Sequence, residues 1–262
     1  MRVSVKGISV IGPGLNGWRH ASSVLSGEQA WRHEPVEKLK PALLPPNERR
    51  RTTQLIKLAL QSAEEAQLQS GMGSDDLACV FASSDGDTFI VDRLCDALTL
   101  PERPVSPTQF HNSVHNAAAG YWAIAAKAQR FSTSISAGAA SFAAGLLEAM
   151  SYVVAEDEAV LLVCYDVALP EPLDCFGINH ETFATALVLV PEGEGGTATL
   201  SLMGEDVAGR RGRLPTGLEE LRAQNPAAEA LPLLQVLAMG GVDTVSLAYL
   251  DGGSIAVEVA GS

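Results

Sequence analysis

Residues 132–155 read STSISAGAASFAAGLLEAMSYVVA. The sequence up to residue 137 is typical of a short strand, and the small residues 138–141 predict a tight turn. Beyond the turn, larger apolar residues recur three or four positions apart and therefore share one helix face: Leu146, Leu147, Met150, Val153 and Val154. Several enzyme folds hold a nucleophile on a sharp turn of this kind. No Cys, Ser or Thr stands at its vertex here, and the nearest hydroxyls belong to Ser136 and Ser141.

The composition is that of a globular chain whose charge disfavours nucleic acid as a partner. Only 19% of its 262 residues are charged, and the formal net charge is −13 without a long Lys or Arg run. The first residues reach Gly and Pro too early for the apolar region of a signal peptide. Residues 135–155 are nearly uncharged and about long enough to cross a membrane, but their many alanines and Glu148 favour a buried core helix. We therefore expect a soluble, cytoplasmic protein with no membrane partner.

Two motifs resemble binding sites for a cofactor or a metal, and for both the sequence favours a structural role. The string GPGLNG at residues 12–17 matches a dinucleotide-binding fingerprint, but the second strand with its terminal acid is missing. His111 and His115 have the spacing of zinc ligands on one helix face. Asn112 stands where a metalloprotease has its Glu, and no third ligand is evident. The sequence predicts neither a metal nor a cofactor.

The acids near residue 86 are expected to have no role in metal binding, and the cysteine thiols are expected to be reduced. Asp85 and Asp87 follow an apolar run, and a turn with an Asp helix cap explains them better than a metal site does. The cysteines lie far apart with no C-x-x-C spacing, as is typical of reduced thiols: Cys79, Cys95, Cys164 and Cys175.

Apolar patterning predicts an alternation of strands and helices along the chain. The predicted strands are residues 3–11, 77–82, 131–137, 159–165, 184–190 and 197–203, with a final hairpin of residues 245–250 and 255–259. The predicted helices are residues 18–25, 48–70, 88–98, 218–223 and 227–239, besides those around residues 121 and 146.

Arg49, Arg50 and Arg51 fall in the first turn of the predicted helix 48–70, for which Asn47 is a suitable N-cap. Positive charge at this position opposes the helix dipole. Either the helix end is simply solvated, or the arginines form a docking patch for an acidic partner such as an acyl carrier protein.

The run from the loop at residue 105 to the turn resembles the β-ketoacyl synthases, the condensing enzymes of the thiolase fold. The residues that carry the resemblance are VSP at 105–107, NAAAG at 116–120 and SISAGA at 134–139. In that family the strand ends in S-I-x-x-A-C-x-S, whose Cys takes the acyl chain. Matching Ser134 and Ile135 to this string puts Ala139 at the position of the nucleophile. Because a methyl group forms no thioester, the covalent step is absent there.

The resemblance implies an α/β fold: a layered α/β/α thiolase-like domain with a mixed five-stranded sheet, truncated relative to a full ketosynthase. It covers about residues 1–203, and we expect residues 204–262 to form a short helix-plus-hairpin extension packed on the same domain. Active members carry two further His in their second half, in strings like H-G-T and G-H-x-x-x-A-A-G. After Ala139 neither string occurs, and His180 is the only His.

The resemblance therefore implies an inactive subunit like the chain length factors, which pair with a full-length ketosynthase in fatty-acid, polyketide and aryl-polyene-type pathways and help shape the acyl tunnel. In the family, the strand before the turn pairs across the dimer axis. We expect that edge and the helix face with Tyr121, Trp122 and Ile124 to be covered by the partner. The candidate interface or tunnel residues are Gln109, Phe110, Asn112, Asn116, Ser134 and Ser136.

Two alternatives stay open. The chain could be a carrier-protein-binding scaffold that does not shape a tunnel. It could also be a standalone acyl thioester hydrolase or transferase that uses Ser141, or Cys175 with His180 as its base.

Overall fold

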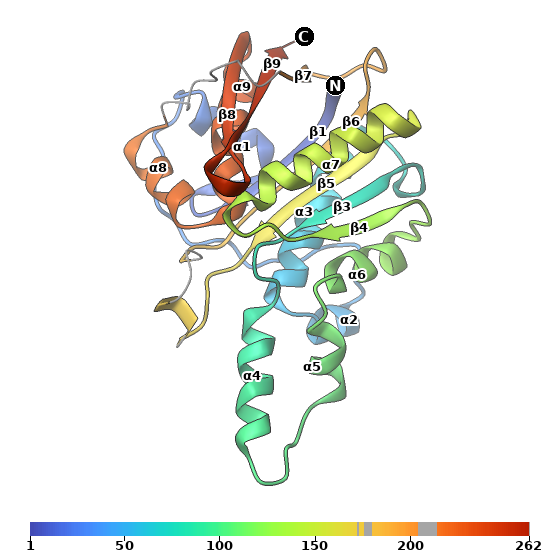
Figure 1. Cartoon of the computed structure of the whole chain (residues 1–262), viewed down its shortest axis with the longest axis vertical. Helices are drawn as coiled ribbons and strands as arrows, with labels where there is room; N and C mark the ends of the chain where they lie inside the picture. The colour runs from blue at the N-terminus through green and yellow to red at the C-terminus, as the bar shows by residue number, and fades with distance from the viewer. Residues whose placement is uncertain (172, 176–179, 204–213, 262) are drawn as a thin grey trace.

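One mixed sheet organises the chain (Figure 1), and its strand order is β4-β3-β5-β6-β1-β7-β9-β8, with β2 beside β1. The structure is a computed structural model that describes residues 1–171, 173–175, 180–203 and 214–261. Strands β3, β4 and β5 are parallel, and the other neighbours are antiparallel. The strands are β1 (Arg2–Gly12), β2 (Leu15–Asn16), β3 (Ala78–Ala82), β4 (Ser132–Ile135), β5 (Val160–Asp166), β6 (Phe183–Pro191), β7 (Ala198–Leu202), β8 (Val242–Ala248) and β9 (Ser254–Gly261).

The expectation of five strands was too low, because the described residues contribute nine to this sheet. The additional strands arise at the C-terminal side, where β9 pairs with β7 from Ala198↔Gly261 to Leu202↔Val257. Strand β8 then pairs with β9 to close the hairpin. The C-terminal hairpin thus continues the main sheet. The α/β fold class and the mixture of parallel and antiparallel strands in the sheet are as predicted.

Helices cover both faces of the sheet, which gives three layers (Figure 1). One face carries α1 (Gly17–Leu25), α7 (Ser141–Glu156), α8 (Thr216–Ala223) and α9 (Leu231–Met239). The other carries α3 (Gln54–Ser70) and α6 (Ala117–Ala126). Alternation along the strands explains this division: in β5, Leu162 faces the α7 side, whereas Leu161 and Val163 face the α3 side. Each central strand therefore needs apolar residues at nearly every position.

Two glycines permit close contact between these layers. A Cβ on Gly145 of α7 would lie 2.9 Å from the Cβ of Ala82 and 3.0 Å from Cδ1 of Leu162. A Cβ on Gly7, beside the bulge in β1, would lie 2.1 Å from the carbonyl oxygen of Ala66 on α3. At these two glycines the helices therefore pack against the two faces of the sheet without an intervening side chain.

Helix α7 accounts for the nearly uncharged apolar segment at residues 135–155. The helical stretch Gly138–Glu156 is the one segment of the described chain that is long and apolar enough to cross a membrane by length and composition. Half of its most apolar window is buried, and Leu146 and Met150 are fully enclosed in the core against β3 and β5. Its apolarity is that of a core helix.

The long helix expected at residues 48–70 is two helices, α2 (Pro46–Arg51) and α3. Thr52 has an extended backbone (ψ 152°) and ends α2, and the hydroxyl of Thr53 accepts the Ile56 N–H at 3.2 Å to cap α3. Gly71 ends α3 in the left-handed conformation. The arginines at 49–51 therefore occupy the last turn of α2, where positive charge favours the helix dipole.

Helices α4 (Thr88–Thr99) and α5 (Pro107–Asn112) extend from the body as a pair, here named the helical arm (Figure 1). Asp87 caps α4 through its side chain, as predicted, and Ser106 caps α5. Within α4 only Thr88 and Ile90 are buried. The arm leaves large apolar side chains exposed on its surface: Phe89, Val91, Leu98, Leu100 and Phe110.

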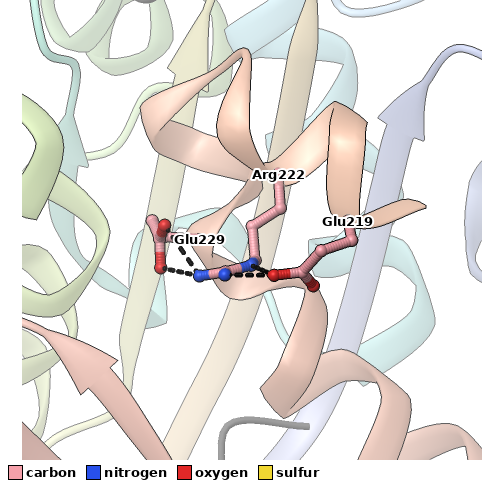
Figure 2. Close-up of polar contacts among 3 residues, drawn as sticks. All are labelled: Glu219, Arg222 and Glu229. Atoms are coloured by element: carbon pink, nitrogen blue, oxygen red, sulfur yellow. Dashed lines mark hydrogen bonds and ion pairs between the residues drawn. The ribbon is translucent and has the colours of Figure 1, made fainter. Parts of the chain in front are cut away.

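The turn between α8 and the 3-10 segment Pro226–Ala230 is fixed by a charged triplet (Figure 2). The Arg222 guanidinium donates from Nε to Glu219 Oε1 at 3.0 Å and from Nη1 to Glu229 Oε2 at 2.9 Å. Its side chain is only 18% exposed, so this pairing is screened less than a surface ion pair. Next to it, buried Asn225 donates to the carbonyls of Asp166 and Glu181 at 3.2 and 2.7 Å.

Asp166 holds the ends of the parallel strands together. Its Oδ1 accepts the Ser83 hydroxyl at 2.8 Å and the Ser84 N–H at 2.9 Å, which ties the end of β5 to the loop after β3. Burial raises the pKa of the Asp166 carboxyl to about 7, although both hydrogen bonds oppose the rise. An Asp in an unfolded chain has a pKa near ~4.

This raised pKa predicts a stability slope. Between about pH 4 and pH 7 the folded chain holds a proton that the unfolded chain lacks, so the free energy of unfolding falls as pH rises, by at most about 1.4 kcal/mol per pH unit from this group. In Asp166→Asn, which cannot titrate, urea denaturation over pH 4–8 should give a shallower decline than in the unmodified protein. Asp157→Asn, at an exposed position, should keep the original slope. Equal slopes for Asp166→Asn and the unmodified protein would contradict the assignment.

Candidate functional site

The turn between β4 and α7 forms as predicted, with Ala139 exposed at its vertex. Gly138 has φ 55°, a conformation that suits glycine, and the Ala140 N–H donates to the Ala137 carbonyl at 3.0 Å. The segment Gly138–Ala140 then leads directly into α7. The turn thus presents a methyl group at its exposed vertex.

The Ser141 hydroxyl is a structural group. It is buried, donates to the Gly138 carbonyl at 2.7 Å and accepts the Ala137 N–H at 3.0 Å, which closes the turn. Within the described chain, neither hydrogen bond of this hydroxyl is to a histidine or a carboxylate. These contacts disfavour Ser141 as a nucleophile.

Two of the four cysteine thiols, those of Cys79 and Cys164, are buried in the core. Burial raises the pKa of the Cys79 thiol to about 12 and raises that of Cys164 well above its ordinary value. Both are therefore inert core residues, as expected for Cys164. Cys175 is exposed in the segment Leu173–Cys175. Residues 176–179, between it and His180, lie outside the described residues.

The two histidines considered as zinc ligands have separate partners. His115 donates from Nε2 to the Ser83 carbonyl at 3.1 Å, and the His111 ring meets Tyr121 edge-on with 6.4 Å between ring centroids. Among the residues that the structure describes, no three His, Cys, Asp or Glu side chains form a group that could hold a metal.

Strand β4 is an edge of the sheet with a free outer side in the described chain. The Phe131 carbonyl accepts the N–H of Cys79 in β3, and the Ile135 carbonyl accepts that of Ser83 just after β3. The intervening Ser132 and Ser134 therefore direct their N–H and C=O outward. The buried Ser134 hydroxyl has no hydrogen-bond partner among the described residues. The exposed Ser136 hydroxyl donates to the Ser84 carbonyl at 2.7 Å. A strand could add at this edge.

The other interface candidates fall on the arm and on the helix beside β4. Phe110 is 66% exposed on α5, and Asn116 is exposed at the start of α6. Asn112 is buried, where it accepts the Tyr121 hydroxyl at 3.1 Å and donates to the Arg51 carbonyl at 3.4 Å. Gln109 lines a pocket of about 410 Å³ between α3, α4 and α5. The structure thus exposes Phe110 and Asn116 but commits Asn112 to holding α5 against α2 and α6.

The exposed apolar residues of α6 differ in part from those predicted. Trp122 is 1% exposed and belongs to the core, whereas Ile124 is 82% exposed. Beside Ile124, a groove of about 610 Å³ runs between residues 43–45 and α6. The exposed surface of α6 therefore centres on Ile124 and Gly120, with Tyr121 half-buried.

Arg50 and Arg51 line the 410 Å³ pocket, while Arg49 donates from Nη2 to the Leu44 carbonyl at 2.8 Å. Asp87 and Arg93 line the same pocket, which no sequence motif indicated. From the sequence, Asp87 was interpreted as a helix cap, and no role was predicted for Arg93. Only the fold of the arm against α3 reveals this grouping.

Solved structures with this fold include three that contain ketosynthases. The chain is similar to a chain of the ketosynthase ApeO in complex with its chain length factor ApeC from Xenorhabdus doucetiae, with 22% identity, a TM-score of 0.71 and 99% of each chain covered. It is similar to a chain of the ishigamide ketosynthase/chain length factor, with 13% identity, a TM-score of 0.72 and 99% of each chain covered. The complex of AntDE with the acyl carrier protein AntF gives 12% identity and a TM-score of 0.74, over 100% of this chain and 99% of the other.

No curated protein gives a significant match to the sequence. The profile of the family described as beta-ketoacyl synthase, N-terminal domain, matches residues 23–239. This match runs past residue 203, where we expected the resemblance to end. With most of its length matched and a thiolase-like fold, the chain belongs to the beta-ketoacyl synthase N-terminal domain family.

Proposed function

We propose that this chain is a non-catalytic subunit, like a chain length factor, that forms a heterodimer with a complete β-ketoacyl-ACP synthase. In that role it helps to shape the acyl tunnel in fatty-acid, polyketide or polyene biosynthesis. The observation that carries the proposal is Ala139 at the vertex of an otherwise intact turn. The scaffold for a nucleophile is kept while the nucleophile and the family's two His strings are missing from the sequence.

The unpaired edge of β4 supports the proposal of a partner. Outward-facing N–H and C=O groups at Ser132 and Ser134 offer hydrogen bonds to an added strand. Exposed apolar side chains flank this edge on α6 and occur on the helical arm, and Ile124 and Phe110 are the most exposed of them. An obligate interface that covers such surfaces buries on the order of 2,000 Å² or more.

The similar structures supply the nature of the partner. Two of them are complexes or pairs of a ketosynthase with a chain length factor, and the third includes an acyl carrier protein. We propose the same kinds of partner here, with Arg50 and Arg51 on the exposed end of α2 as the docking site for the acidic carrier. Arg49 is half-buried and contributes less. A cytoplasmic location and the division near residue 203 remain predictions.

Partner binding should depend on the outward N–H of Ser134. Ser134→Pro removes this donor without removing a hydrogen bond to β3, and its ring blocks an added strand. When co-expressed with a full ketosynthase encoded nearby, Ser134→Pro should bind it at least about tenfold more weakly, measured by size-exclusion chromatography and titration.

Ser134→Ala is the matched control, because it deletes the hydroxyl and keeps the N–H. It should bind the ketosynthase as the unmodified chain does, and both variants should retain the thermal melt of a folded protein. Equal binding by Ser134→Pro and Ser134→Ala would remove β4 from the interface. Failure of the unmodified chain to bind any such ketosynthase would overturn the proposed function.

Product length should depend on Phe110. Because this side chain is 66% exposed on the arm, it is free to enter the partner's tunnel. Phe110→Ala should enlarge the tunnel and shift the products of the heterodimer to longer chains, as measured by mass spectrometry. Leu68→Ala, at an equally exposed position on α3, should leave the product distribution unchanged.

The alternatives give different outcomes in these experiments. A carrier-binding scaffold that shapes no tunnel would keep the product length in Phe110→Ala. A standalone hydrolase or transferase would form a covalent acyl adduct on the isolated chain after incubation with acyl thioesters. The hydrogen bonds of Ser141 disfavour the latter.

A further inference from the structure

The sheet has a second free edge, at the end opposite to β4. Strand β8 is the last strand in the sheet order (Figure 1), and β9 is its one neighbour among the described residues. A strand without an outer neighbour offers a row of N–H and C=O groups to another strand. The proposed contact with a ketosynthase uses β4 and leaves this edge unexplained.

The hydrogen bonds to β9 show which groups of β8 face outward. The Gly261 N–H donates to the Gly241 carbonyl at 2.7 Å, just before β8 begins. The Tyr249 N–H donates to the Gly253 carbonyl at 2.8 Å, just after β8 ends. Because inward and outward residues alternate along an antiparallel strand, the odd-numbered residues bond to β9. The even-numbered residues direct their N–H and C=O away from the sheet: Val242, Thr244, Ser246 and Ala248.

The outward residues of β8 are spaced so that the strand can pair with a second copy of itself. In an antiparallel pair about a two-fold axis at Val245, Val242 of one copy lies opposite Ala248 of the other. Thr244 lies opposite Ser246 in the same way. Each outward residue thus meets an outward residue of the second copy, and both can form ladder hydrogen bonds.

The charges of the strand permit this pairing. Asp243 is the one charged residue of β8, and in this register it lies opposite Leu247 of the second copy. Edge strands that stay single are commonly protected by Lys, Pro or a bulge. The sequence VDTVSLA contains neither Lys nor Pro, and its pairing with β9 runs without a register shift. On a chain of net charge −13, two copies can therefore approach along this edge with little repulsion.

Exposed apolar side chains lie at both ends of the strand. Met239 and Val242 are 65% and 71% exposed at its start, and Leu250 is 50% exposed just beyond its end. Antiparallel pairing brings the start of one strand to the end of the other, which places Leu250 of the second copy near Gly240. Since Gly240 has no side chain, Leu250 has room to pack there beside Val242. A self-pair consequently covers apolar groups that one chain leaves in water.

We propose that β8 is a self-association edge, at which two copies of this chain pair antiparallel about Val245 and join their sheets into one. The contact consists of one strand and its flanking side chains, so the association is reversible and depends on concentration. Because β4 and β8 lie at opposite ends of the sheet, self-association leaves the edge of β4 open. With a ketosynthase bound at β4, the assembly is then two heterodimers joined through β8.

Asp243 limits the strength of this pair. Its Oδ1 accepts the Thr244 N–H at 2.8 Å, which withdraws one outward donor from a second copy. Asp243→Ala frees this N–H and should strengthen the dimer about fivefold. Asp243→Asn is the matched control, because it removes the charge but keeps the acceptor oxygen, and it should leave the dimer unchanged.

The test is sedimentation equilibrium of the isolated full chain over a range of concentrations. The unmodified chain should show a monomer–dimer equilibrium. Ser246→Pro removes an outward N–H without removing a hydrogen bond to β9, so it should weaken the dimer at least about tenfold. Ser246→Ala keeps the N–H and should match the unmodified chain.

A chain that stays monomeric at all concentrations overturns the proposal. A dimer that Ser134→Pro abolishes and Ser246→Pro keeps would place the contact at β4 and overturn it as well. Open-ended oligomers would indicate head-to-tail pairing of β8 with β4, which also contradicts a closed self-pair. If Ser246→Pro gives no thermal melt of a folded protein, Asp243→Ala decides: a dimer no stronger than that of Asp243→Asn contradicts the pairing at Thr244.

This inference and the proposed function fail separately. A chain that is monomeric alone and forms a single heterodimer with a ketosynthase would lose the β8 contact and keep the subunit function. A chain that self-associates through β8 but binds no ketosynthase would lose the subunit function, with the β8 contact intact.

Discussion

Burial of the central strands on both faces is the constraint on which the rest of the structure depends. All seven residues of β5 are buried, as are all five of β3, and their side chains alternate between the two helical layers. Neither helical layer can be removed without exposing a continuous apolar surface. The close contact of α7 at Gly145 and of α3 near Gly7 follows from this arrangement. The described chain therefore leaves unpaired backbone at the edge of β4 and exposed apolar side chains on the helical arm, where this double covering ends.

Much of this arrangement could be predicted from short apolar runs. The strands at β3, β5 and β6 read as continuous apolar segments, and the turn at Gly138 was recognisable from its small residues. The width of the sheet could not be predicted, because the pairing of β7 with β9 joins distant residues. The break at Thr52 was missed although the Thr-Thr pair offered a cap, since helical periodicity continues across it. Trp122 was placed on the wrong side because α6 is apolar all round.

The site was predictable to the extent that its chemistry is local. Ala139 could be found from its neighbours in sequence, and the structure keeps it at the exposed vertex of the turn. The interface residues were harder, because exposure depends on tertiary packing: Phe110 lies free, while Asn112 is held between Tyr121 and α2. The grouping of Asp87 with Arg93 had no sequence signal. Each has an ordinary local role in α4, and only the folding of the arm against α3 brings Arg50 beside them.

The edge at β4 is four residues long, and three of its side chains are hydroxyls. Short, polar edges pair poorly with random strands, whereas long apolar edges promote aggregation. The brevity and polarity of this edge therefore lower the risk that unrelated strands add to it before the partner proposed above binds.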